Sequence, residues 1–279
     1  KNSKIFLAGH TGMVGSTLLS ELHSRGYDNV FTIKSKDLDL KNQHLTNQYI
    51  LDTKPEYIFL VAAKVGGIQA NINNPGEFLY DNLMIQSNVI NSAKDANVKR
   101  LLFLGSSCIY PRMAKQPMVE DYILNGPLEP TNESYAIAKI AGIKLCQYFK
   151  KQYNCNFFSV IPPNIYGPYD NFSLKSSHVV SALIKKIYKA KIVGANTLTL
   201  WGTGKARREL MYSEDLVDGL IFLMKKDIKE NYINLGTNMD VSISSLANLI
   251  KKVIGYNGNF EWDSDKPDGM PKNSWIQVK

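Results

Sequence analysis

The feature that most constrains the fold is a glycine-rich turn between a short apolar run and a helical pattern near the start of the sequence. Residues 4–8 are mostly apolar, and Gly9, Gly12 and Gly15 follow at once. Apolar residues then recur at helical spacing over 13–25. Such a turn lets the backbone approach a pyrophosphate, whose charge the helix N-terminus favours. The sequence therefore predicts a dinucleotide site, although the spacing is G-x-x-G-x-x-G rather than G-x-G-x-x-G.

Strand-like and helical runs alternate through the first part of the sequence. This alternation predicts an α/β fold, a Rossmann-type doubly wound parallel sheet with helices on both faces. Continuous apolar runs at 57–62 and 101–104 suit central strands that are covered on both sides. We expect residues 1–165 to form the dinucleotide-binding domain. Residues 166–279 are expected to form mainly a smaller C-terminal substrate-binding lobe, with segments near 213–235 returning to the main sheet.

Composition excludes several classes of protein. Of the 279 residues, 44% are hydrophobic, which is enough for a full core, but no apolar run approaches the roughly 18 residues of a membrane-spanning helix. The net charge of +8 comes from lysines scattered over helical segments, so we expect solvated faces and no nucleic-acid or membrane partner. Cys108, Cys146 and Cys155 are too few and too oddly spaced for a disulfide framework or a zinc site. We therefore expect no metal and a cytoplasmic location.

Tyr135 and Lys139 form a candidate catalytic pair. Four residues span just over one helical turn, so both side chains project from one face. A nearby cation favours the phenolate, and we expect it to lower the pKa of Tyr135 enough for proton exchange near neutral pH. The hydroxyl of Ser107 can hydrogen-bond the same substrate oxygen. With the upstream glycine turn, this pattern predicts hydride transfer at a carbinol or ketone carbon.

The end of the second predicted strand indicates which dinucleotide is used. An acidic residue there would hold the ribose 2′-hydroxyl of NAD. This sequence instead has Lys34 and Lys36, whose ammonium groups would attract the 2′-phosphate of NADP. Asp37 and Asp39 follow closely, so NADP(H) is a preference over NAD.

Longer motifs resemble the extended short-chain dehydrogenase/reductase family over nearly the whole sequence. Within it, the sequence is similar to the branch that epimerises and reduces GDP-4-keto-6-deoxy-mannose. The motifs are Ala63-Lys-Val-Gly-Gly-Ile68, Gly105-Ser-Ser-Cys-Ile-Tyr-Pro111, Leu128-Glu-Pro-Thr-Asn-Glu133, Tyr135-Ala-Ile-Ala-Lys139, Tyr166-Gly-Pro168, Ser177-His-Val179, Trp201-Gly-Thr-Gly204, Arg208-Glu209 and Lys266-Pro-Asp-Gly269.

The resemblance implies an NADPH-dependent epimerase/reductase that forms a GDP-L-fucose-type product, and a homodimer. It implies that Ser107, Tyr135 and Lys139 form the reductase centre, and that Cys108 and His178 transfer protons at C3 and C5. The residues it implies at the cofactor are Gly9, Thr11, Gly12, Met13, Val14, Gly15, Lys34, Lys36, Ala62, Ala63, Lys139, Pro162, Asn164 and His178. Those it implies at the GDP-linked 4-keto-deoxy sugar are Val65, Gly66, Ser107, Cys108, Asn164, Lys186, Trp201, Arg208 and Lys266.

Four positions depart from the family pattern. Thr11 stands where we expect an arginine near the cofactor phosphate, and Lys186 also replaces an arginine. Pro163 stands where we expect threonine, and Ser181 where we expect proline. The last two changes lie close to the proposed epimerisation groups.

Other functions stay open beside the epimerase/reductase. One is a C4-reductase without epimerase activity, acting on a GDP-4-keto-6-deoxy-heptose or hexose. Another is a non-catalytic NADP-sensing protein, which the presence of Ser107, Tyr135 and Lys139 disfavours. A 4,6-dehydratase would need a carboxylate pair where Cys108 and Ile109 stand.

Overall fold

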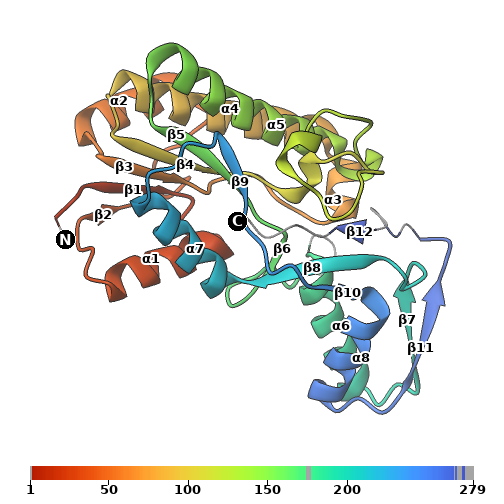
Figure 1. Ribbon diagram of the computed structural model, residues 1–279. Coiled ribbons are helices and arrows are strands. Elements are labelled where there is room, and N and C mark those ends of the chain that lie inside the picture. The colour runs from red at the N-terminus through yellow and green to blue at the C-terminus, as the bar shows by residue number, and fades with distance from the viewer. Residues whose placement is uncertain (1, 174–176, 267, 269–271, 274–279) are drawn as a thin grey trace.

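A six-stranded parallel sheet forms the centre of the molecule in the computed structural model, which describes residues 2–173, 177–266, 268 and 272–273 (Figure 1). Every neighbouring pair of its strands is parallel. In sheet order the strands are β2 (Val30–Phe31), β1 (Ile5–Ala8), β3 (Tyr57–Leu60), β4 (Arg100–Leu104), β5 (Phe157–Ile161) and β9 (Tyr232–Asn234). The predicted fold class is confirmed.

Helices cover both faces of this sheet (Figure 1). One face carries α1 (Met13–Ser24) and α7 (Ser213–Lys225), and the other carries α2 (Gln43–Thr53), α4 (Pro75–Asp95) and α5 (Glu133–Tyr153). Successive side chains of a strand point to opposite faces of the sheet. Along β1, Phe6 therefore packs into one buried cluster and Leu7 into the other. Since both faces are covered, the strand reads as a continuous apolar run rather than an alternating one.

The C-terminal part divides between this sheet and a second lobe. Strand β9 pairs with β5, and α7 packs against α1. The lobe contains α6 (Val179–Ile192), α8 (Ile243–Ile254) and the parallel pair β7 (Thr197–Trp201) and β11 (Asn259–Asp263). Strand β8 (Arg207–Tyr212) pairs with β6 (Asn164–Tyr166), β10 (Asp240–Ser242) and β12 (Lys272–Asn273).

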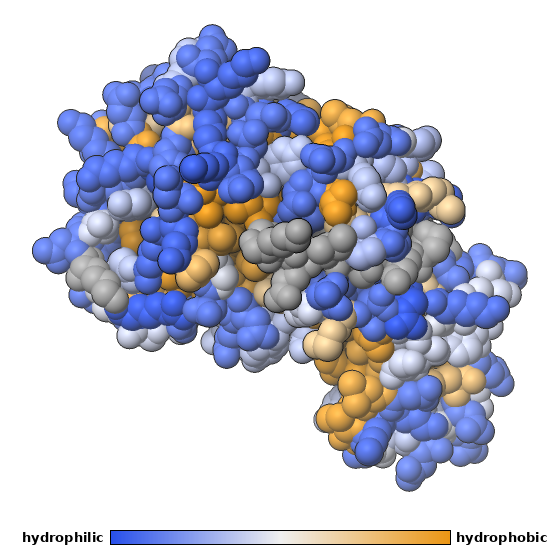
Figure 2. All heavy atoms as spheres, viewed as in Figure 1, coloured by the Kyte–Doolittle hydropathy of each residue, from blue (hydrophilic) through white to orange (hydrophobic). Residues whose placement is uncertain are grey.

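The lobe stands out from the main body in the space-filling view (Figure 2). It has its own buried cluster, in which Leu183 and Ile187 of α6 meet Leu246 and Ile250 of α8. Other short helical elements are α3 (Ile68–Asn73), η1 (Ser107–Ile109), η2 (Glu120–Tyr122) and η3 (Pro130–Asn132). Among the helices of the described residues, none combines the length and apolar character needed to cross a membrane.

Candidate active site

A pocket of about 760 Å³ opens at the carboxyl ends of the central strands. Its walls come from the turn after β1, from 61–66 after β3, from 104–107 after β4 and from 162–165 after β5. Strand β1 is followed by a helix on one face of the sheet and β3 by helices on the other, so the pocket lies at the switch point of the topology. Ligands of open α/β sheets bind at such a crevice.

The glycine turn after β1 is shaped by close backbone packing. Gly9 has φ +101°, and a Cβ at this position would lie 2.6 Å from the backbone nitrogen of Ala62. A Cβ on Gly15 would collide with the carbonyl oxygen of Gly9. Gly12 differs, because the nearest atom to its Cβ position is 3.8 Å away and the position is exposed. Gly9 and Gly15 are therefore required by the close packing of the backbone, whereas Gly12 leaves room for a ligand.

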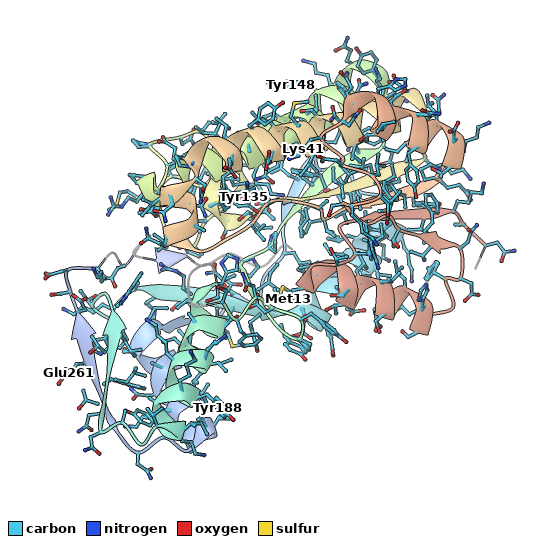
Figure 3. The ribbon with its side chains drawn as sticks, turned by 180° about the vertical axis from the view of Figure 1, so that it is seen from behind. Met13, Lys41, Tyr135, Tyr148, Tyr188 and Glu261 are labelled. Atoms are coloured by element: carbon cyan, nitrogen blue, oxygen red, sulfur yellow. The ribbon has the colours of Figure 1, made fainter. Side chains whose placement is uncertain are left out.

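The N-terminus of α1 fits a dinucleotide diphosphate. Gly12 is its N-cap and forms no side-chain cap, and the first turn of the helix has no acidic residue. The first N–H groups of a helix have no partner within the helix, and they favour an anion. Met13, at the start of α1, and Tyr135, on α5, both line the pocket and lie on either side of it (Figure 3).

The three candidate reductase residues meet at the pocket. Ser107 begins η1 directly after β4, and Tyr135 and Lys139 lie one turn apart near the start of α5. All three line the pocket. The buried ammonium group of Lys139 donates a 2.8 Å hydrogen bond to the carbonyl oxygen of Leu104 and lies 5.7 Å from the ring centroid of Tyr135.

The pKa values of this pair differ from the expectation. Burial raises the pKa of Tyr135, the nearby Cys108 adds to that rise, and a hydrogen bond with Ser106 opposes it. Burial lowers the pKa of Lys139 to about 8. The expected lowering of the Tyr135 pKa is therefore not found in this structure, because desolvation of the hydroxyl dominates.

Cys108 and His178 approach the pocket from different elements. Cys108 follows Ser107 in η1 and is buried beneath the pocket wall, and burial raises the pKa of its thiol to about 11. His178 is the N-cap of α6 and lines the pocket with an accessible side chain. The surrounding protein lowers the pKa of His178, and the charge of Asp170 opposes that shift.

Residues 5–236 match the family described as NAD dependent epimerase/dehydratase. The chain belongs to this family. A GDP-L-fucose synthase of Sinorhizobium fredii is 48% identical over 269 residues, which cover 96% of this chain and 85% of the relative. These findings confirm the resemblance stated from the sequence motifs.

Two solved structures from Campylobacter jejuni are also similar. A GDP-6-OMe-4-keto-L-xylo-heptose reductase matches with a TM-score of 0.92 and 34% identity, covering 99% of this chain and 90% of the other. A GDP-mannoheptose C4 reductase with NADP bound matches with a TM-score of 0.89 and 36% identity, covering 98% and 90%.

Most residues expected at the cofactor of this epimerase/dehydratase line the pocket. They are Gly9, Thr11, Gly12, Met13, Val14, Gly15, Ala62, Ala63, Lys139, Pro162, Asn164 and His178. Lys34 and Lys36 are exposed at the end of β2 and do not line it, although Ser35 between them does. Lys34 lies near the glycine turn, because its charge adds to burial in lowering the pKa of His10. Within the described residues neither lysine forms an ion pair with a carboxylate.

The residues expected at the GDP-sugar fall into two groups. Val65, Gly66, Ser107 and Asn164 line the pocket. Cys108, Lys186, Trp201, Arg208 and Lys266 do not, and the last four belong to the smaller lobe and to strand β8 beside it.

Three residues of the second group form a cluster around an aromatic ring. The ammonium groups of Lys186 and Lys266 lie 5.0 Å and 5.9 Å from the ring centroid of Trp201. Arg208 donates hydrogen bonds to the carbonyl oxygens of Arg207 and Asp268, at 2.8 Å and 3.0 Å. The cluster places two cations beside the exposed ring of Trp201. Part of the Arg208 guanidinium is instead hydrogen-bonded to the backbone of Asp268.

Sequence reasoning missed several residues that line the pocket. Ser106 interacts with both Tyr135 and Cys108, and Asp170 acts on His178. Lys41 and Asp81 form part of a charged network at the wall formed by α4. In the sequence, that network is indicated only by Asp81 and the polar residues near it on the same side of α4.

Proposed function

We propose that this protein is an NADPH-dependent epimerase/reductase that converts a GDP-4-keto-6-deoxy-mannose type of sugar to a GDP-L-fucose-type product. The observation that carries the proposal is the meeting of Ser107, Tyr135 and Lys139 in one pocket beside an open glycine turn. The 48% identity to a GDP-L-fucose synthase over 96% of the chain supports the choice of substrate.

The glycine turn and α1 suit the diphosphate of the cofactor, and the exposed Lys34 and Lys36 suit its 2′-phosphate. The NADP-bound reductase structure supports this choice of cofactor. When bound, NADPH supplies the hydride that reduces the C4 ketone. The protein's own contribution is to orient the ketone and to provide the proton.

Tyr135 is the group that we assign to that proton transfer. Because its pKa is raised, the hydroxyl keeps its proton at neutral pH and can donate it to the C4 oxygen as negative charge develops there. Ser107 can donate a second hydrogen bond to the same oxygen. The cation of Lys139, one turn along α5, stabilises that developing charge.

Cys108 and His178 are the groups that we assign to epimerisation. A 4-ketone acidifies the protons on its neighbouring carbons, so a base can remove one and an acid can return it to the opposite face. Burial keeps the Cys108 thiol protonated, and the lowered pKa of His178 keeps its imidazole neutral near pH 7. The resting pair therefore holds one proton donor and one acceptor, which is what inversion needs.

A C4-reductase without epimerase activity is the second candidate. It is favoured by the place of Cys108, which lies beneath the residues that line the pocket. The similarity to two reductases for GDP-linked heptoses also supports it. A non-catalytic NADP-binding protein is disfavoured, because Tyr135, Lys139 and Ser107 are all present and adjacent to the pocket.

Incubation in deuterated water separates these functions. The protein is mixed with NADPH and GDP-4-keto-6-deoxy-mannose, and in parallel with the 4-keto-6-deoxy-heptose analogue. Loss of NADPH absorbance with deuterium at C3 and C5 supports the epimerase/reductase. NADPH loss without deuterium assigns the C4-reductase, and no NADPH loss with either sugar refutes both enzymatic functions.

We further infer a homodimer in a reducing, cytoplasmic setting. Cys108, Cys146 and Cys155 are all free, which suits a reducing compartment. Tyr80 on α4 and Tyr148 on α5 are large exposed side chains, and they support an association through these helices. Figure 3 labels Tyr148 on α5. Sedimentation at micromolar concentration tests the dimer, and a monomer throughout would refute it.

A further inference from the structure

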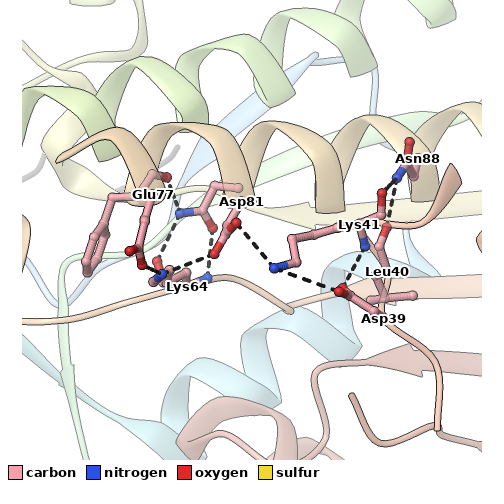
Figure 4. A network of polar contacts seen from close by, with 9 residues as sticks. Asp39, Leu40, Lys41, Lys64, Glu77, Asp81 and Asn88 are labelled. Carbon is pink, nitrogen blue, oxygen red and sulfur yellow. Dashed lines mark hydrogen bonds and ion pairs between the residues drawn. The ribbon is translucent and has the colours of Figure 1, made fainter. Parts of the chain in front are cut away.

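Asp81 of α4 lies between two lysines that come from different loops of the pocket (Figure 4). One oxygen of its carboxylate is 3.4 Å from the ammonium group of Lys41, and the other is 3.1 Å from that of Lys64. Lys41 follows β2, and Lys64 follows β3. One side chain therefore joins two segments that are far apart in the sequence.

The same helix holds the backbone of both segments. The side chain of Asn82 accepts a 2.8 Å hydrogen bond from the N–H of Lys64 and donates one of 3.0 Å to its carbonyl oxygen. The side chain of Asn88 donates to the carbonyl oxygens of Leu40 and Lys41, at 2.9 Å and 3.0 Å. These anchors are buried, so they fix the base of each loop and leave Asp81 to connect the loops by charge.

The two loops form different parts of the pocket wall. Residues 38–41 line the side beyond β2, and residues 61–66 line the side beyond β3. The second loop contains Ala62 and Ala63, expected at the cofactor, and also Val65 and Gly66, expected at the sugar. Residues 38–41 belong to the segment after β2 that also carries Lys34 and Lys36, expected at the 2′-phosphate, so a connection between the loops links a cofactor-binding segment to one that reaches the sugar.

The link is electrostatic and partly shielded from water. The Asp81 side chain is only 17% exposed, against 64% for Glu77, the other carboxylate bound to Lys64. Burial alone would raise the pKa of Asp81, but hydrogen bonds from Lys64 and Lys41 outweigh it and hold the pKa below its ordinary value. Asp81 is thus charged at neutral pH. Because the ion pairs are partly buried, salt screens them less than it would screen exposed pairs.

We propose that Asp81 is a positioning residue that couples the two loops, so that dinucleotide bound against residues 38–41 orders residues 61–66 for the sugar nucleotide. The inference rests on the proposed function for the identity of the ligands. The path runs from Lys41 through Asp81 to Lys64. By linkage, the coupling acts equally in both directions.

Hydrogen–deuterium exchange read by mass spectrometry tests this coupling without turnover. The protein is measured with and without saturating NADPH, and the exchange of residues 64–66, the part of the loop expected at the sugar rather than at the cofactor, is compared. We expect NADPH to slow exchange there by about 5-fold or more in the unchanged protein. Asp81→Asn and Lys41→Met should each remove most of that slowing, because each breaks the path.

Glu77→Gln is the matched control, since it changes a carboxylate to an amide on the same helix, and among the described residues the Glu77 carboxylate pairs with Lys64 and not with Lys41. It should leave the NADPH-dependent slowing intact. NADPH titration by fluorescence ensures that each variant is saturated. Full slowing in Asp81→Asn, an equal loss in Glu77→Gln, or no NADPH effect in the unchanged protein overturns the proposal. None of these measurements uses the sugar nucleotide. If the proposed substrate is wrong, the activity assay shows it independently, because NADPH is then not oxidised.

Discussion

The ammonium group of Lys139 donates a 2.8 Å hydrogen bond to the carbonyl oxygen of Leu104, the last residue of β4. This bond ties α5 to the end of a central strand and fixes the turn that carries Tyr135. It also holds a lysine in a setting where burial lowers its pKa to about 8. The geometry proposed for catalysis therefore lowers the stability of the fold, because the charged form of Lys139 is kept away from water.

The first prediction follows from that lowered pKa. The folded-state pKa of about 8 lies below the ordinary lysine pKa of 10.5, so between these pH values the unfolded chain binds more protons. Stability contributed by this group therefore rises with pH across that window. The difference between these two pKa values corresponds to about 3 kcal/mol. Relative to Lys139→Met, the free energy of unfolding of the unchanged protein should rise by about that amount between pH 7 and pH 10.5.

Urea denaturation of both proteins at several pH values measures this difference. At pH 7 the variant loses the hydrogen bond to Leu104 but also loses a buried charge, so its stability should be close to that of the unchanged protein. A stability difference that stays constant from pH 7 to pH 10.5 would contradict the prediction.

The second prediction compares two glycines of the same turn. Gly12→Ala places a methyl group in open space at a helix N-cap with extended backbone, so its stability should change by at most about 1 kcal/mol. The methyl group should nevertheless weaken NADPH binding roughly tenfold or more, since it occupies the space left for the diphosphate. Fluorescence titration and thermal unfolding check the two effects.

Gly15→Ala serves as the contrast. Its methyl group would meet the backbone of Gly9 and His10, so we expect a loss of about 1–3 kcal/mol in stability. If the two variants were equally stable, the different roles assigned to Gly12 and Gly15 would be wrong.

The third prediction concerns cofactor preference. Lys34 and Lys36 are exposed and lie beside the pocket, where each can give a charge-assisted contact to a 2′-phosphate of about 1–2 kcal/mol. NADPH should therefore bind more tightly than NADH. Lys36→Glu should erase or reverse that preference, because it replaces attraction by repulsion. Equal dissociation constants for the two cofactors in the unchanged protein would refute the assignment.

The sequence predicts the parallel sheet and the glycine turn because both depend on local pattern. Runs such as 57–62 are apolar without alternation, which only a strand covered on both faces explains. The family motifs likewise locate Ser107, Tyr135 and Lys139, since their roles depend on residue type and spacing.

Other features depend on packing between distant segments, and the sequence does not reveal them. The raised pKa of Tyr135 reflects how completely its surroundings exclude water. The contact of Lys41 with Asp81 joins a loop to a helix 40 residues further along the chain. Strands of the smaller lobe such as β6, three residues long, carry too few residues for a periodic signal, so their pairing with β8 emerges only in the fold.

The last prediction separates the two proposed chemistries by their proton-transfer groups. Tyr135→Phe should reduce NADPH oxidation by roughly 10²-fold or more, because no acid remains to protonate the C4 oxygen. It should leave deuterium exchange at C3 and C5 largely intact, since Tyr135 takes no part in that step. Cys108→Ser should do the converse, abolishing exchange while a substrate supplied already epimerised is still reduced. Mass spectrometry of the sugar and NADPH absorbance measure the two steps on the same sample.

His178→Gln provides the internal check, because exchange with inversion needs both a donor and an acceptor. It should resemble Cys108→Ser and not Tyr135→Phe, even though His178 lines the pocket and Cys108 lies beneath its wall. If both variants reduce the ketone and exchange deuterium at the rate of the unchanged protein, neither residue transfers the proton. If the unchanged protein reduces the ketone without any exchange, the protein is a plain C4-reductase. Cys108 would then be a buried packing residue beside Ser107.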